Sequence, residues 1–148
     1  MSKTISVPYE TTIHVRDHCM CLTVQRAARA LARLFDDALR PHDLTNGQFS
    51  LLMSLNRPEP PNLSSVASLL AMDRTTLTAA LKPLERRGLV RAVTDPNDKR
   101  SRLLALTQEG TRLLFDVMPI WKSTHGELEQ VLTPGEQGRL LTDLRKLL

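Results

Sequence analysis

The sequence predicts a mainly α-helical (α+β) protein in which a series of helices is interrupted once, by a β-hairpin. Apolar residues in most segments recur three and four positions apart, which is the period of an amphipathic helix. Residues that commonly cap helix N-termini precede several of these segments. Only one stretch, between residues 89 and 106, changes to short β-compatible runs around a turn-rich centre.

The length and composition fit a single globular domain. The chain has 148 residues, of which 41% are hydrophobic and 24% are charged, a balance typical of folded proteins. No apolar run approaches the roughly 18–20 residues of a membrane span, and the first residues lack the apolar region of a secretory signal. We therefore expect a cytoplasmic protein with no membrane partner.

The first segments are predicted to be an arm followed by helices. Residues 1–17 have no apolar period and contain Pro8, so we expect a flexible N-terminal arm. Apolar positions between residues 19 and 39 follow the helical period and predict one long amphipathic helix. Thr45, with Gln48 three residues later, predicts a capping box that opens the next helix.

Two further helices and the hairpin follow a proline-rich loop. Ser64 is the predicted cap of a short helix, and Asp73 is the predicted N-cap of a longer helix that ends before Gly88. We expect strands at residues 89–94 and 102–106, with an extended charged loop between them. A short helix, a tight turn, a second helix and a hairpin form the plan of a winged helix-turn-helix.

The C-terminal segment is predicted to be helical again. Thr107 caps a long helix, and Thr133 with Glu136 forms a capping box that places Pro134 at the first position of the terminal helix. Leucines give this terminal helix an apolar stripe, which a small domain would leave exposed unless another surface covered it. The stripe consists of Leu140, Leu141, Leu144, Leu147 and Leu148.

Positive charge concentrates in the predicted helix-turn-helix and hairpin. Between Arg74 and Arg102, eight cations stand against three carboxylates, a net charge of +5, whereas the whole chain carries +4. This concentration predicts a polyanionic partner, double-stranded DNA. Small threonine and alanine side chains would let the second helix lie deep in a major groove, where threonine methyl groups can meet thymine methyl groups. The residues predicted from this pattern to contact DNA are Arg74, Thr75, Thr76, Thr78, Ala79, Lys82, Lys99 and Arg100.

Four spaced motifs resemble the MarR family of bacterial transcriptional regulators, over about residues 20–148. They are DRTTLT (73–78), LERRGLV (84–90), DPNDKRS (95–101) and LTQEG (106–110). The family's wing signature is Asp-x-Arg, followed after a short strand by Leu-Thr-x-x-Gly. The residues that match it are Asp98, Arg100, Leu106, Thr107 and Gly110.

The resemblance implies a single MarR-type domain, residues 1–148, that works as a homodimer. Its winged helix-turn-helix would occupy about residues 44–106. Helices at residues 18–40 and 107–148 would interlock with those of a second copy and so cover the leucine stripe. A two-fold dimer implies a pseudo-palindromic operator, with half-site centres about one helical turn, 34 Å, apart.

Positions carried over from the family add further DNA contacts. Arg100 would reach the minor groove, and Asp98 would orient its side chain through a charge-assisted hydrogen bond. Ser64 and Ser65 would touch backbone phosphates. Pro83 departs from the commonest recognition-helix sequence of the family.

The resemblance also implies a repressor that a signal releases from DNA, either a small aromatic acid-like effector or an oxidant. Cys19 and Cys21 lie near the start of the first long helix, where a thiol is a candidate redox sensor. Packing is the alternative role, because free cysteine is among the most often buried residues. Zinc ligation by these cysteines with His42 or His125 matches no strong metal spacing, so we expect no metal and no cofactor.

Two other classes of function are alternatives. A winged-helix module that binds protein rather than DNA would leave the basic residues as a plain solvated surface. An enzyme has little support, because the sequence has no glycine-rich phosphate loop and no nucleophile beside a recognisable base. We therefore expect no catalytic residue.

Overall fold

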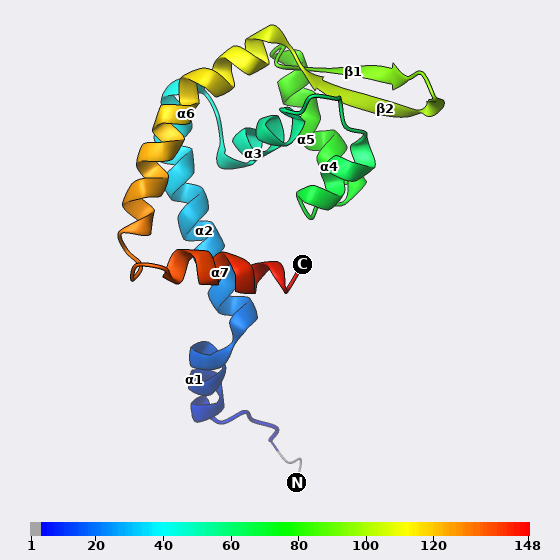
Figure 1. Ribbon diagram of the computed structural model, residues 1–148. Coiled ribbons are helices and arrows are strands. Elements are labelled where there is room, and N and C mark those ends of the chain that lie inside the picture. The colour runs from blue at the N-terminus through cyan, green and yellow to red at the C-terminus, as the bar shows by residue number, and fades with distance from the viewer. Residues whose placement is uncertain (1–3) are drawn as a thin grey trace. The chain divides into compact units, whose positions relative to one another are not determined.

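The computed structural model describes residues 4–148 as a mostly helical chain with one two-stranded sheet (Figure 1). The fold class predicted from the sequence is therefore confirmed. The chain divides into two compact units, one extending to Leu34 and the other spanning Phe35–Leu148, and each is described by itself. Within residues 4–148, no helix combines the length and the apolar character needed to cross a membrane.

The first unit contains α1 (Tyr9–His18) and the larger part of α2 (Met20–Leu39). The prediction of a flexible arm at residues 1–17 is wrong from residue 9 onward, where the chain is helical; residues 1–3 lie outside the described part. Basic residues in the last turn of α1 complement the helix dipole. The helix buries no side chain, so it needs no apolar stripe, and its sequence gave no periodic signal.

The long amphipathic helix predicted from residue 19 to residue 39 is confirmed as α2, which begins one residue later. Cys19 separates it from α1 with extended backbone (φ −77°, ψ 109°). On α2, the side chains of Val24, Leu31 and Leu34 are still 38–40% exposed. Part of the apolar stripe of this helix is therefore open to a further partner.

The second unit holds the hydrophobic core. After α2 come η1 (Arg40–His42), α3 (Asn46–Leu55), α4 (Leu63–Leu69), α5 (Arg74–Arg86), β1 (Val90–Asp95), β2 (Asp98–Leu106), α6 (Gln108–Glu129) and α7 (Glu136–Arg145). Helix α3 contacts α4, α6 and β2, while α5 contacts α4 and β1. The fully buried side chains at the centre of this core are all aliphatic: Leu39, Leu52, Val66, Leu77, Leu84 and Val117.

Side-chain caps determine where several of these helices begin. The capping box predicted at Thr45 is confirmed: its hydroxyl oxygen accepts from the Gln48 amide at 3.1 Å, and the Gln48 side chain accepts from the Thr45 amide at 3.1 Å. Asp73 caps α5 and Thr107 caps α6, also as predicted. These local signals were strong because each cap satisfies backbone donors that the helix itself cannot satisfy.

The predicted start of α4 is wrong. Asn62 caps this helix instead of Ser64, and its Oδ1 accepts a hydrogen bond from the Ser65 amide at 2.8 Å. Asparagine is as good a cap as serine. Starting the helix earlier also brings Leu63 into the helix, where it packs against the core.

The predicted start of α7 is also wrong, because the helix begins at Glu136 rather than at Pro134. Gly135 has a φ of 87°, which no residue inside a right-handed helix adopts. Half of the predicted capping box forms, since the Glu136 carboxylate accepts from the Thr133 amide at 2.9 Å.

Strands β1 and β2 pair antiparallel and form the predicted hairpin. The extended loop predicted at residues 95–101 is wrong, because Asp95 lies opposite Asp98 and only the two residues between them connect the strands. The register shifts just before this pair, so residues 99–101 have no partner on β1. The charged segment is thus a bulge on a strand instead of a free loop.

Candidate nucleic-acid interface

A tight turn separates α4 from α5. Ala71 has a φ of 52°, in the left-handed region, and its amide donates to the Ser68 carbonyl oxygen at 3.1 Å. The Met72 amide donates to the Ala67 carbonyl oxygen at 2.9 Å. This pair of bonds is a Schellman motif, which ends α4 abruptly and lets α5 begin almost at once. The result is the geometry of a helix-turn-helix.

Helix α5 has one buried face and one exposed face. Leu77, Leu81 and Leu84 are buried in the core of the second unit. The remaining circumference carries the residues that sequence reasoning selected, and all are exposed: Arg74, Thr75, Thr76, Thr78, Ala79 and Lys82. The structure thus places them together on a surface that a ligand can reach.

The threonines of α5 use their hydroxyl groups differently. The Thr76 amide and hydroxyl donate to the two carboxylate oxygens of Asp73 at 2.7 and 2.8 Å. These bonds hold the pKa of Asp73 below its ordinary value of 3.8, because they favour the charged carboxylate. The Thr78 hydroxyl donates to the Arg74 carbonyl oxygen at 2.8 Å. The Thr75 side chain makes no hydrogen bond within residues 4–148, so its hydroxyl is available to a ligand.

The two serines predicted to touch phosphates differ in the same way. Ser64 is exposed, whereas Ser65 is half-buried and its hydroxyl donates to the Asn62 carbonyl oxygen at 3.1 Å. Asn62 was missed as the organising residue here. Its position directly after the prolines and before an apolar segment was the available signal, because prolines favour extended backbone before a helix cap.

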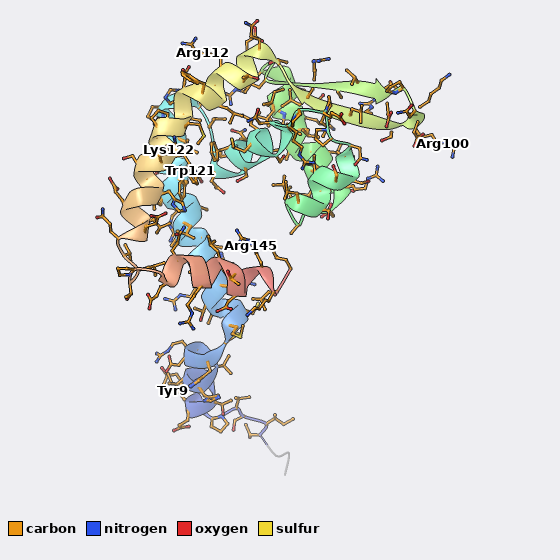
Figure 2. The ribbon with its side chains drawn as sticks, viewed as in Figure 1. Tyr9, Arg100, Arg112, Trp121, Lys122 and Arg145 are labelled. Atoms are coloured by element: carbon orange, nitrogen blue, oxygen red, sulfur yellow. The ribbon has the colours of Figure 1, made fainter. Side chains whose placement is uncertain are left out.

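The wing carries its cations in the bulged part of β2. Lys99 and Arg100 are both exposed, and Figure 2 shows Arg100 at the outer end of the hairpin. The charge-assisted bond expected between Asp98 and the Arg100 side chain is wrong: Asp98 Oδ1 accepts from the Arg100 backbone amide, at 3.0 Å. A short acidic side chain two residues earlier reaches the main chain most easily. Asp98 therefore shapes the backbone of the bulge and leaves the guanidinium to a ligand.

The wing and α5 are attached to α6 through a close backbone contact. The Thr107 hydroxyl donates to the Gly88 carbonyl oxygen at 2.6 Å, and the Thr107 amide donates to the Leu89 carbonyl oxygen at 3.1 Å. Gly110 is buried so close to Leu89 that an added Cβ would overlap the Leu89 carbonyl oxygen. This contact explains why the Leu-Thr-x-x-Gly motif needs its threonine and its glycine.

A cavity of about 380 Å³ lies between α3, the end of α4 and α6. Its lining is mainly apolar, with Phe49, Met53, Leu69 and Trp121 among the residues that form it. Trp121 stacks between Phe49 and His125, with ring centroids 6.4 and 4.7 Å away. Sequence reasoning did not find this cavity, because its walls come from three separate segments.

Cys19 and Cys21 both belong to the first unit and are free thiols. Cys19 is half-buried and Cys21 is exposed, and their sulfur atoms accept hydrogen bonds from the Leu22 amide at 3.4 Å and from Gln25 Nε2 at 3.3 Å. In the part of the chain that the structure describes, no three histidine, cysteine or acidic residues are grouped so that they could hold a metal ion.

Comparison with known proteins supports this geometry. The MarR family model matches residues 44–101. The transcriptional regulator HosA of Escherichia coli O111:H- is 35% identical over 108 residues, which are 72% of this chain and 78% of HosA. Matches to other curated relatives cover as little as 50% of the relative.

Solved structures are similar over most of the chain. The M. tuberculosis transcriptional regulator MosR in complex with DNA is 35% identical, with a TM-score of 0.80 over 88% of this chain and 93% of MosR. The transcriptional repressor CouR bound to a 23-mer DNA duplex is 28% identical, with a TM-score of 0.80 over 90% of this chain and 94% of CouR. CouR from Rhodococcus jostii RHA1 has also been solved with p-coumaroyl-CoA, at 25% identity and a TM-score of 0.77 over 88% and 92% of the two chains. This chain therefore belongs to the MarR family of winged helix-turn-helix transcriptional regulators.

Proposed function

We propose that the protein is a homodimeric transcriptional repressor that binds double-stranded DNA through α5 and the β1–β2 wing. The observation that carries the proposal is the exposed polar face of α5, which lies with the basic wing in one compact unit of a MarR-family chain. Family membership favours this function over a module that binds only protein. Concentrated positive charge also gives such a surface a strong, sequence-independent attraction for DNA.

Helix α5 lies in the major groove and the wing contacts the neighbouring minor groove. The free hydroxyl of Thr75 and the ammonium group of Lys82 are then available to base edges or phosphates, while the guanidinium of Arg100 enters the minor groove. Asp98 acts indirectly, by shaping the bulge that presents Arg100. The full proposed contact set is Ser64, Ser65, Arg74, Thr75, Thr76, Thr78, Ala79, Lys82, Asp98, Lys99 and Arg100.

The dimer uses the helices outside the winged helix-turn-helix. We assign residues 44–106 to DNA binding, and residues 18–40 and 107–148 to contact with a second copy. Leucines exposed on the last segment support this assignment: Leu140 is 46% exposed and Leu147 is 59% exposed. A second copy would remove this apolar surface from water. Two-fold symmetry then requires a pseudo-palindromic operator with half-sites about 34 Å apart.

A small aromatic acid or its thioester is the proposed effector, and the cavity beside Trp121 is its proposed site. The aromatic and aliphatic lining suits a planar apolar ligand. The cavity also touches α4, so a ligand there can change the position of the helix that precedes α5. The complex of CouR with p-coumaroyl-CoA supports this ligand class.

Oxidation of Cys19 or Cys21 is the second proposed signal. The exposure of Cys21 and the position of Cys19 at a break between helices favour it, because oxidant must reach the sulfur. We further propose that the protein works in the cytoplasm, where it meets DNA, and that it has no catalytic activity. Its relatives are transcriptional regulators.

Fluorescence anisotropy with DNA from the gene's own upstream region tests the proposal. We expect tight binding that weakens steeply with salt, and Arg100→Ala should bind about 10-fold more weakly or worse. Arg112→Ala is the matched control, because this arginine lies on α6 and pairs with Asp116. If selection from random DNA yields no binding sequence either, the proposed function is wrong.

The same titration separates the two signals. Release by a phenolic acid such as p-coumaric acid, without any effect of peroxide, supports the cavity as the sensor. Release by peroxide that disappears in the double variant Cys19→Ser, Cys21→Ser supports the thiols. A peroxide response that persists in this double variant would contradict the role of the cysteines.

A further inference from the structure

We propose that Arg87 is a positioning residue for the recognition helix, and that DNA affinity depends on the forked shape of its guanidinium rather than on its charge. The inference rests on the proposed function, since it assigns to α5 the role of reading DNA. Arg87 is the C-cap of α5 and lies outside the proposed contact set.

The side chain of Arg87 bridges from the end of α5 to a distant part of the chain. Its Nη1 donates to the Asp43 carbonyl oxygen at 2.6 Å, and its Nη2 points to the His42 carbonyl oxygen at 3.5 Å. The acceptors belong to the turn that joins η1 to α3, more than forty residues earlier in the sequence. One side chain thus connects the recognition helix to the segment that follows α2.

These carbonyl groups suit a cation. They stand at the C-terminal end of η1, where backbone carbonyls lack helical donors and the helix dipole is negative. Asp43 has a φ of 53°, in the left-handed region, and the Leu44 amide closes the turn by donating to the Leu39 carbonyl oxygen at 3.4 Å. The turn therefore presents two neighbouring carbonyls in one direction, which a planar guanidinium can meet with two donors.

The next two residues attach α5 on another side. The carbonyl oxygens of Gly88 and Leu89 accept hydrogen bonds from the Thr107 hydroxyl and amide, at the N-terminus of α6. Three consecutive residues, 87–89, consequently join the end of α5 to two separate elements. With the Arg87 connection removed, Thr107 alone would set the direction of this end of the helix.

An exposed arginine beside a DNA-binding helix can also serve simply as a phosphate contact, and the two roles predict different results. Lysine keeps the charge for a phosphate but loses the fork needed to span two carbonyls. Arg86 is the matched control, because it is the exposed neighbour of Arg87 and its side chain makes no hydrogen bond within residues 4–148.

The experiment compares Arg87→Lys, Arg87→Ala and Arg86→Lys with the wild type by anisotropy over a range of salt concentrations. We expect Arg87→Lys to lose about fivefold in affinity, the equivalent of one net hydrogen bond, while Arg86→Lys binds like the wild type. The slope of log K against log salt should stay unchanged in both Arg87 variants. Wild-type affinity in Arg87→Lys, or a slope reduced by about 0.9 in Arg87→Ala, would overturn the proposal in favour of a phosphate contact.

Hydrogen exchange of the free protein gives a readout that needs no DNA. Backbone amides of residues 42–46 should exchange faster in Arg87→Lys than in the wild type, and at the wild-type rate in Arg86→Lys. Equal exchange in all three proteins would overturn the proposal. A wild type that binds no DNA would refute the proposed function, and the exchange experiment would still decide whether Arg87 holds this turn.

Discussion

Gly110 lies where a side chain has no room, in the first turn of α6. A Cβ at this position would overlap the Leu89 carbonyl oxygen, which also accepts the Thr107 amide. Gly110→Ala should therefore lower the free energy of unfolding by about 3 kcal/mol, because the backbone must shift. Urea denaturation measures this, with Gly126→Ala as control. Gly126 lies in the same helix with nothing within 4 Å of an added Cβ, so alanine there should stabilise the protein by roughly 0.5–1 kcal/mol.

Ala71 has the opposite problem, a side chain where the backbone favours glycine. Its φ of 52° crowds the Cβ of any L-residue. Ala71→Gly should thus raise the free energy of unfolding by about 0.5–1 kcal/mol without altering DNA affinity, since the turn geometry is retained. Ala30→Gly, at an exposed right-handed position on α2, should destabilise the protein instead. The same sign for both variants in thermal unfolding would contradict the assigned strain.

At the scale of elements, Asp36 ties the last turn of α2 to the start of α3. Its Oδ1 accepts from the Asn46 amide at 2.7 Å and from Asn46 Nδ2 at 2.8 Å. These bonds, the backbone bond foremost, hold the pKa of Asp36 below its ordinary value of 3.8. The stability that they contribute is present above the unfolded-state pKa of about 3.9 and is lost as the pH falls through the lower, folded-state value.

We expect the free energy of unfolding to decline more steeply below pH 4 in the wild type than in Asp36→Asn, which keeps an acceptor but does not titrate. Urea denaturation between pH 5 and pH 2 measures the difference. Asp73 shifts in the same direction, so both proteins should carry Asp73→Asn to isolate the contribution of Asp36. Parallel pH profiles would contradict a role for the Asp36–Asn46 bonds.

The elements also show how far the sequence alone could predict the fold and the site. Thr45, Asp73 and Thr107 mark helix starts correctly, because each cap is decided by residues three or four positions away. Tertiary effects escaped prediction: the bulge on β2 depends on pairing with β1. The bond from Arg87 to Asp43 joins residues 44 positions apart. Helix α1 gave no signal because it buries nothing.

On the scale of the whole molecule, the exposed leucines of α7 should decide the oligomeric state. Leu140 and Leu141 are 46% and 39% exposed in the single chain, and burying such surface is the main driving force for association. Leu140→Glu combined with Leu141→Glu should therefore shift the protein to monomers, because two desolvated carboxylates would oppose the interface. Sedimentation equilibrium measures the mass in solution directly.

The same variant should bind a two-half-site operator far more weakly, by about 100-fold, because the second half-site no longer gains from being tethered to the first. Its affinity for a single half-site should match that of the wild type, since α5 and the wing are unchanged. Val15→Glu is the control, because Val15 is 52% exposed on α1, outside the segments assigned to the dimer. A double variant that still sediments as a dimer would place the interface elsewhere and leave the leucines of α7 without that role.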